Sequence, residues 1–231
     1  MSALIPAVFG GFLLLVVVAV VVGWLRAKRR REGFAALAAG RGWTYTEQDQ
    51  TLLDRFAGAP FGEGEDREAS NVLRGTSDGR PFVVFDYRYV TTSTTTDAEG
   101  HTRTERHTHP FSVVAVNAGA VMPALSVTPE GMFSRFFGRL TNSDIELESE
   151  DFNRAFRVTC PNRRFASDVL HPRMMELVLQ WPEMAWRFDA DSLLAVRDGS
   201  HDIPEIDAKL AALDAILDTV PDFVWKEVRG R

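Results

Sequence analysis

The sequence predicts an α+β fold: an N-terminal transmembrane helix followed by one domain with a mainly antiparallel sheet and packed helices. Three observations lead to this prediction. The chain begins with a long uncharged apolar run, its middle alternates apolar and polar residues, and its last third has apolar residues at helical spacing. With 231 residues, 45% of them hydrophobic, the chain is long enough for one such segment and one domain.

The apolar run covers residues 4–25, which include no charged side chain. As a helix rising about 1.5 Å per residue it would measure roughly 33 Å, enough for a hydrocarbon core of about 30 Å. Trp24, a residue type common at membrane interfaces, is followed by five cations before the first acidic residue: Arg26, Lys28, Arg29, Arg30 and Arg31. Because no cation precedes the run, the positive-inside rule predicts an external N-terminus and a cytoplasmic C-terminal domain.

These features predict three parts: a transmembrane anchor over residues 1–25, a basic juxtamembrane segment over 26–32 and a cytoplasmic domain over 33–231. The protein is then a single-pass protein of the cell membrane. Its partners are the lipid bilayer and, through Trp24 and the five cations, anionic lipid headgroups. Ala3, Ala7 and Gly11 recur every four residues, so weak homo-oligomerisation through close helix pairing is an alternative to an ordinary small-residue composition.

The charge balance excludes a nucleic-acid partner for the domain. Without the five juxtamembrane cations, the 26 Lys and Arg residues fall to 21, against 32 Asp and Glu. Binding to nucleic-acid phosphates depends on basic side chains that such an acidic domain lacks. The single cysteine, Cys160, excludes both a disulfide-stapled scaffold and a zinc finger.

Strand patterns dominate the middle of the chain. Residues 70–76 and 81–92 flank a Ser-Asp-Gly-Arg turn, and a third alternating run covers 102–117, which together predict an antiparallel meander. Shorter strand candidates follow at 124–128, 144–147, 156–159, 186–188 and 192–196. The helices predicted from apolar spacing and proline positions are 34–39, 164–170, 172–180 and 203–220.

Three histidines are candidate metal ligands. His101, His107 and His109 lie within nine residues, and in an extended chain His107 and His109 point to the same face. The alternative is an exposed hairpin arm rich in Thr, Arg and His, in which cross-strand pairs stabilise the ribbon. Arg103 and Arg106 are close by and would repel a metal cation, which favours the alternative. No cofactor is predicted.

The sequence gives weaker support for a catalytic cysteine, a calcium site or a nucleotide-binding site. Cys160 could act as a nucleophile near a histidine, but it ends an apolar strand, where a small buried residue is expected. The acidic residues around 144–151 lack the spacing of a calcium loop, and Ser149 is better interpreted as the cap of a short helical turn. No phosphate-binding glycine loop, dinucleotide fingerprint or nucleophile elbow is present in the sequence.

Several short segments carry a resemblance. They are Asn71-Val72-Leu73-Arg74-Gly75, Phe85-Asp86-Tyr87, the run from Glu150 to Val158, and the run from Arg164 to Leu170. With the N-terminal apolar segment, they resemble an uncharacterised family of actinobacterial single-pass membrane proteins of unknown function. The resemblance implies no activity.

The sequence therefore favours a non-enzymatic, membrane-tethered cytoplasmic module that binds a lipid or an unknown protein partner. Two alternatives belong to other classes. One is a membrane-anchored, metal-dependent hydrolase that uses His101, His107 and His109, and the other is a homo-oligomeric structural membrane protein.

Overall fold

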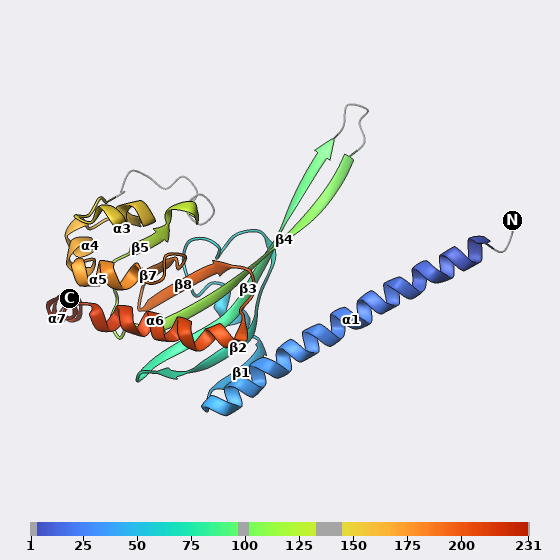
Figure 1. Ribbon diagram of the computed structural model, residues 1–231, viewed down its shortest axis with the longest axis horizontal. Helices are drawn as coiled ribbons and strands as arrows, with labels where there is room; N and C mark the ends of the chain where they lie inside the picture. Colours follow the sequence, from blue (N-terminus) through green and yellow to red (C-terminus); the bar gives the residue numbers. More distant parts are fainter. Residues whose placement is uncertain (1–3, 97–101, 133–144, 231) are drawn as a thin grey trace.

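The computed structural model describes residues 4–96, 102–132 and 145–230, with the side chains of the N-terminal helix described from residue 14 onward. The strands in these ranges form one antiparallel sheet in the order β1-β2-β3-β4-β8-β7-β5-β6 (Figure 1). They are β1 (Thr44–Gln48), β2 (Glu65–Ser77), β3 (Arg80–Thr96), β4 (Thr102–Asn117), β5 (Leu125–Pro129), β6 (Phe156–Thr159), β7 (Trp186–Asp189) and β8 (Ser192–Asp198).

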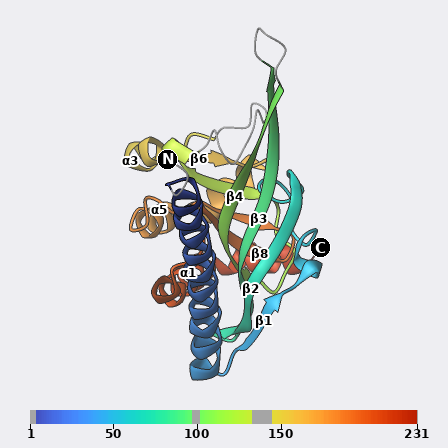
Figure 2. The same cartoon turned by 90° about the vertical axis from the view of Figure 1, so that its right-hand side faces the viewer.

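Helices cover one face of this sheet (Figure 2). The α-helices are α1 (Leu4–Arg41), α3 (Glu150–Ala155), α4 (Arg163–Val169), α5 (Pro172–Val178), α6 (Ile206–Thr219) and α7 (Asp222–Arg229). Three single turns accompany them: η1 (Gln50–Leu52), η2 (Glu130–Met132) and η3 (Ile203–Glu205). The C-terminal part of α1 lies against the sheet, and its N-terminal part extends away from the body of the protein (Figure 1).

The alternation of the long strands gives each face of the sheet its own core. Val84 pairs with Val114 toward the helices, and Phe85 pairs with Val113 toward the opposite face. On the helix side the buried cluster includes Phe34 of α1. On the other side, residues 49–64 cover the sheet and bring buried aromatic side chains onto Phe85.

The α+β organisation and the antiparallel sheet agree with the sequence prediction, and the turns account for several boundaries. Pro172 occupies the first turn of α5, and α6 is followed by Pro221, as expected. The Ser149 hydroxyl accepts a hydrogen bond from the Phe152 amide at 3.3 Å, so it caps α3. The predicted strand at 144–147 is not formed over its described residues 145–147, and α7 was not predicted.

The transmembrane part of the predicted fold class is wrong. Among the described residues, no helix is long and apolar enough to cross a membrane. The apolar run lies in α1, which is a single helix from Leu4 to Arg41. The same helix continues without a break through the cations and ends against the sheet, where Phe34 is completely buried.

The predicted localisation is wrong on the same finding. A single-pass protein of the cell membrane, with an external N-terminus and a cytoplasmic C-terminal domain, requires a spanning helix, and the described residues contain none. Ala3 lies outside the described residues, as do the side chains of Ala7 and Gly11, so pairing through them stays a prediction.

Candidate functional site

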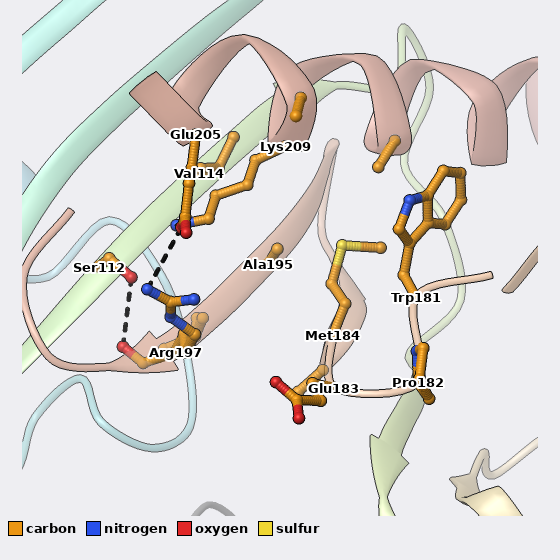
Figure 3. A pocket seen from close by; sticks show the side chains of 14 residues that line it. Ser112, Val114, Trp181, Pro182, Glu183, Met184, Ala195, Arg197, Glu205 and Lys209 are labelled. Carbon is orange, nitrogen blue, oxygen red and sulfur yellow. Dashed lines mark hydrogen bonds and ion pairs between the residues drawn. The ribbon is translucent and has the colours of Figure 1, made fainter. Parts of the chain in front are cut away.

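A pocket of about 400 Å³ lies on the helix-covered face of the sheet. Strands β4 and β8 contribute one side, α6 with the preceding turn η3 contributes a second, and the loop of residues 181–185 contributes a third (Figure 3). Small-molecule sites in proteins occupy about 300–1,000 Å³ and are mostly apolar with a few placed polar groups. The pocket fits that description in size and in lining.

Alanines create the space between α6 and the sheet. Ala212 of α6 and Ala195 of β8 are buried, and the exposed Ala208 lies one helical turn before Ala212. Along the same helix, Leu210 and Leu213 are buried in the core and fill the volume available to them. Methyl side chains at the pocket positions leave a cavity where larger residues would pack.

The end of the pocket beside the loop of residues 181–185 is apolar. Trp181 and Met184 extend into the cavity from this loop, and both are half-buried (Figure 3). Val114 of β4 adds a buried aliphatic surface between the strands and α6. An indole ring and a flexible thioether adapt well to an apolar chain. Glu183 lines the same end but is exposed to solvent.

The opposite end holds three charged groups that share one carboxylate. Glu205 Oε2 lies 3.4 Å from Arg197 Nη2 and 3.2 Å from Lys209 Nζ. Both Glu205 Oε2 and Lys209 Nζ are buried atoms without a hydrogen bond of acceptable geometry among the described residues. The contacts are therefore ion pairs with poor alignment, and the two cations exceed the available carboxylate charge by one.

Burial and these neighbours set the ionisation of the charged end. Burial lowers the pKa of Lys209, and the adjacent Glu205 opposes this effect. The Lys209 ammonium lowers the pKa of Glu205, and Arg197 lowers it further.

The described lining residues include one hydroxyl, that of Ser112, and no histidine or cysteine. The Ser112 hydroxyl donates to the Arg197 carbonyl oxygen at 3.4 Å. Cys160, the nucleophile considered from sequence, is buried elsewhere in the core, where burial raises the pKa of its thiol. Its Sγ donates to the Asn162 carbonyl oxygen at 3.1 Å.

Of the predicted metal ligands, His107 and His109 lie on one face of β4, as expected. His109 Nε2 is 2.8 Å from the Thr91 hydroxyl, and the His109 ring stacks on Tyr89 with centroids 4.8 Å apart. His107 Nε2 is 3.3 Å from the hydroxyl of the cross-strand residue Ser93. Within the described ranges no three His, Cys, Asp or Glu residues are placed to hold a metal. His101 is outside these ranges, so the three-histidine site stays a prediction.

The cations predicted to contact headgroups divide into two groups. Arg26, Lys28 and Arg29 are exposed beside Trp24, and the Lys28 ammonium lies 5.6 Å from the Trp24 ring centroid. Arg31 instead pairs with a carboxylate of β1 at 2.5 Å. Headgroup binding by these residues stays a prediction.

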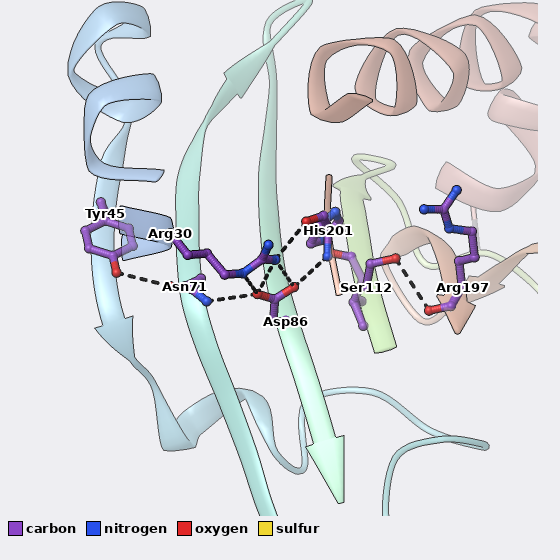
Figure 4. Close-up of polar contacts among 8 residues, drawn as sticks. Arg30, Tyr45, Asn71, Asp86, Ser112, Arg197 and His201 are labelled. Carbon is purple, nitrogen blue, oxygen red and sulfur yellow. Dashed lines mark hydrogen bonds and ion pairs between the residues drawn. The ribbon is translucent and has the colours of Figure 1, made fainter. Parts of the chain in front are cut away.

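Arg30 is held by a carboxylate of the sheet (Figure 4). Its guanidinium donates to Asp86 of β3 at 2.8 and 3.1 Å and to the His201 carbonyl oxygen at 2.8 Å. Asp86 also accepts hydrogen bonds from the Asn71 side chain and the His201 amide, both at 2.8 Å. Arg30 therefore fixes α1 to the sheet.

The charged end of the pocket was not predicted. Glu205 and Lys209 are four residues apart, a spacing at which oppositely charged side chains meet on a helix, and this is the only signal in the sequence. Arg197 and Ser112 come from distant strands that become neighbours because β4 pairs with β8. Nothing in the linear pattern places those strands together.

No protein-family model and no curated protein matches the chain. Among solved structures, the fold is similar to the crystal structure of the mycobacterial trehalose monomycolate transport factor A, TtfA. The TM-score is 0.55 at 16% sequence identity, and the match covers 83% of this chain and 96% of that chain. At this identity the likeness shows the fold alone. The predicted actinobacterial family is not tested by these comparisons and stays a prediction.

Proposed function

We propose that this protein is a non-enzymatic binding module that holds the hydrocarbon chain of a lipid in the pocket between α6 and the β4–β8 strand pair. The observation that carries the proposal is the pocket itself. It is preformed, it has about 400 Å³ of space, and its lining is apolar except at one end. Transfer of apolar surface from water into such a site is favourable by about 25 cal/mol per Å².

The placement of the apolar residues supports a chain-like ligand. Ala195 lies between the charged end and the loop that carries Trp181 and Met184 (Figure 3), and Ala212 also lines the pocket. A linear chain could follow this path with aliphatic and aromatic contacts along its length. A compact polar ligand would leave the same surfaces without a partner.

The name of the structural neighbour lends the proposal coarse support. The neighbouring structure is a transport factor named for trehalose monomycolate, a lipid. A binding role in lipid handling is compatible with a shared fold, but the ligand of that protein is not transferred to this chain.

Titration calorimetry of the full chain with decanol and decanoate tests the proposal. We expect saturable binding of both at concentrations where they remain monomeric. Ala208→Phe places an aromatic ring at the pocket edge and should weaken binding by about tenfold or more, which corresponds to at least about 1.4 kcal/mol.

Ala211→Phe is the matched control. Ala211 is exposed on the same helix but lines a different surface depression, so this variant should bind like the wild type. Absence of binding to any decyl compound, or equal effects of the two variants, would refute the proposal.

A further inference from the structure

The charged groups at one end of the pocket could bind a polar headgroup, which binding of a hydrocarbon chain alone would not require. Glu205 is the carboxylate shared by Arg197 and Lys209, so two positive charges face one negative charge. Lys209 Nζ is buried and makes no hydrogen bond among the described residues. Its neighbouring carboxylate, Glu205, is poorly aligned and shared with Arg197, so an oxygen anion at this position would supply a further acceptor to the buried ammonium.

Other nearby charges do not cancel this excess inside the pocket. Asp202 adds a negative potential at Lys209, but its side chain is exposed to water. His201 is buried, and burial lowers its pKa to about 4, so it is neutral at pH 7. Glu183 belongs to the opposite end and is exposed. The local balance at Arg197 and Lys209 therefore favours an anion over a cation.

The two cations, Arg197 and Lys209, also differ in their exposure to solvent. The Arg197 side chain is 43% exposed, whereas the Lys209 side chain is 17% exposed. A planar guanidinium at the mouth can donate to two oxygens of a carboxylate or phosphate, while the inner ammonium donates to one oxygen as a point charge. An amphiphile could therefore enter with its headgroup near solvent and its chain along the alanines.

From this arrangement we infer that the ligand is a single-chain anionic amphiphile, whose carboxylate or phosphate headgroup binds Lys209 and Arg197 while its chain occupies the apolar part of the pocket. The inference rests on the proposed function and adds the headgroup chemistry. The oxyanion is what the site recognises, and it could belong to a lipid headgroup or to free phosphate. The attached chain distinguishes the two sources.

Four probes separate these possibilities by calorimetry on the full chain: decyl phosphate, decanol, decyltrimethylammonium and inorganic phosphate. Decyl phosphate should bind about tenfold or more tightly than decanol, and decyltrimethylammonium should bind most weakly. Inorganic phosphate should bind at least about tenfold more weakly than decyl phosphate, because it lacks the chain. Added salt should weaken decyl phosphate binding and leave decanol binding unchanged.

Substitutions at the charged end of the pocket provide a second test of the inference. Lys209→Met keeps the length of the side chain and removes its charge, so it should reduce decyl phosphate affinity to that of decanol. Decanol affinity itself should stay within about twofold of the wild type. Lys226→Met on α7 is the matched control and should change neither affinity.

Glu205→Gln acts in the opposite direction. It frees both cations from their shared carboxylate and should raise decyl phosphate affinity by about threefold or more. This variant keeps the inference testable even if Lys209→Met fails to fold, because a gain in binding is not a consequence of misfolding.

Each adverse outcome has a distinct meaning. Equal affinity for decanol and decyl phosphate would overturn the headgroup inference while leaving chain binding intact. Equal affinity for inorganic phosphate and decyl phosphate would overturn the amphiphile and the proposed function together. Tighter binding of decyltrimethylammonium than of decyl phosphate would mean that the site prefers cations, and this would overturn the inference.

Discussion

Asp86 is the residue on which most polar contacts between α1 and the sheet converge. It is 7% exposed and accepts hydrogen bonds from Arg30, from the Asn71 side chain and from the His201 amide. The Tyr45 hydroxyl in turn donates to the Asn71 side-chain oxygen at 3.3 Å. Removal of this buried carboxylate leaves those donors without their acceptor.

Asp86→Asn should lower the free energy of unfolding by about 3 kcal/mol, the lower end of the range for breaking a buried pair, because Arg30 is 32% exposed. Urea denaturation followed by circular dichroism measures this. Asp54→Asn is the control, since Asp54 is 81% exposed and pairs with Arg67 at 3.0 Å. Its cost should stay below about 1 kcal/mol, and equal costs would contradict the role assigned to Asp86.

His201 is a second residue whose environment affects the stability of the fold. Its Nε2 lies 3.1 Å from the Val113 carbonyl oxygen and donates to it when protonated there, while the buried Nδ1 has no hydrogen-bond partner in the part of the chain that the structure describes. Burial lowers the pKa of the side chain from 6.5 to about 4, against the opposing effect of Asp86. The folded protein therefore holds this histidine neutral.

The sign of the pH effect follows from that lowered pKa. Between pH 6.5 and about 4 the unfolded chain binds a proton that the folded protein excludes, so stability is complete above pH 6.5 and is lost as the pH falls. Between pH 6.5 and 5 the loss should be about 2 kcal/mol. Urea titrations at these two pH values should show this difference for the wild type and a smaller one for His201→Gln. Identical pH slopes would contradict the assignment.

At the scale of elements, α1 joins two different environments. Its C-terminal part buries Phe34 and Ala38 in the helix-side core, whereas residues 14–25 are exposed. The Arg30 guanidinium lies 5.1 Å from the Phe34 ring centroid, so the polar and apolar attachments of the helix are adjacent. Gly33 permits the approach of Ile203 from η3, because a Cβ there would lie 2.8 Å from Ile203 Cδ1.

Phe34→Ala tests the apolar attachment of this helix. Phe34 has no exposed surface, so the variant should lose about 3–4 kcal/mol of unfolding free energy through lost burial and the cavity left behind. Phe223→Ala on α7 is the control, because Phe223 is 53% exposed and should cost less than about 1 kcal/mol. A small loss for Phe34→Ala would mean that α1 contributes little to the core. Chemical denaturation of both variants decides this.

Among the strands, β3 and β4 continue beyond their neighbours as a paired arm. Their register runs from Phe82 opposite Val116 to Thr96 opposite Thr102. β2 begins opposite Val90, and β8 pairs with β4 only from Phe111 onward, so no further strand among the described residues pairs with the outer part of the arm. Exposed Thr, Arg and His side chains follow these edges, a composition that discourages pairing with other strands.

At the scale of the whole molecule, one sheet separates two cores, and only one of them contains the pocket. The opposite face is closed by residues 49–64, where Phe56 and Phe61 pack on Phe85 and the Arg187 guanidinium donates to the Ala59 carbonyl oxygen at 2.7 Å. The helix-covered face retains space because alanines line the approach of α6 to β8. Ligand binding is therefore expected on the helix side.

Local sequence patterns predicted most of the elements. Alternation predicted the strands in the middle of the chain, and two prolines predicted helix boundaries: Pro172 at the start of α5 and Pro221 after α6. These signals can be read from sequence because each depends on only a few neighbouring residues. The same local reasoning failed for the apolar run at the N-terminus. It assigned all five cations after the run to lipid headgroups and did not predict that one of them, Arg30, pairs with Asp86 of the sheet.

The amino-acid sequence by itself determined the antiparallel meander, the α+β class and the acidic balance of the chain, since these depend on short-range periodicity and composition. Only the tertiary structure decided where α1 docks and which charges meet in the pocket. Ser112, Arg197 and Lys209 are far apart along the chain and become neighbours through the pairing of β4 with β8 and the packing of α6 across them. Such contacts depend on the order of strands in the sheet, which no local periodicity encodes.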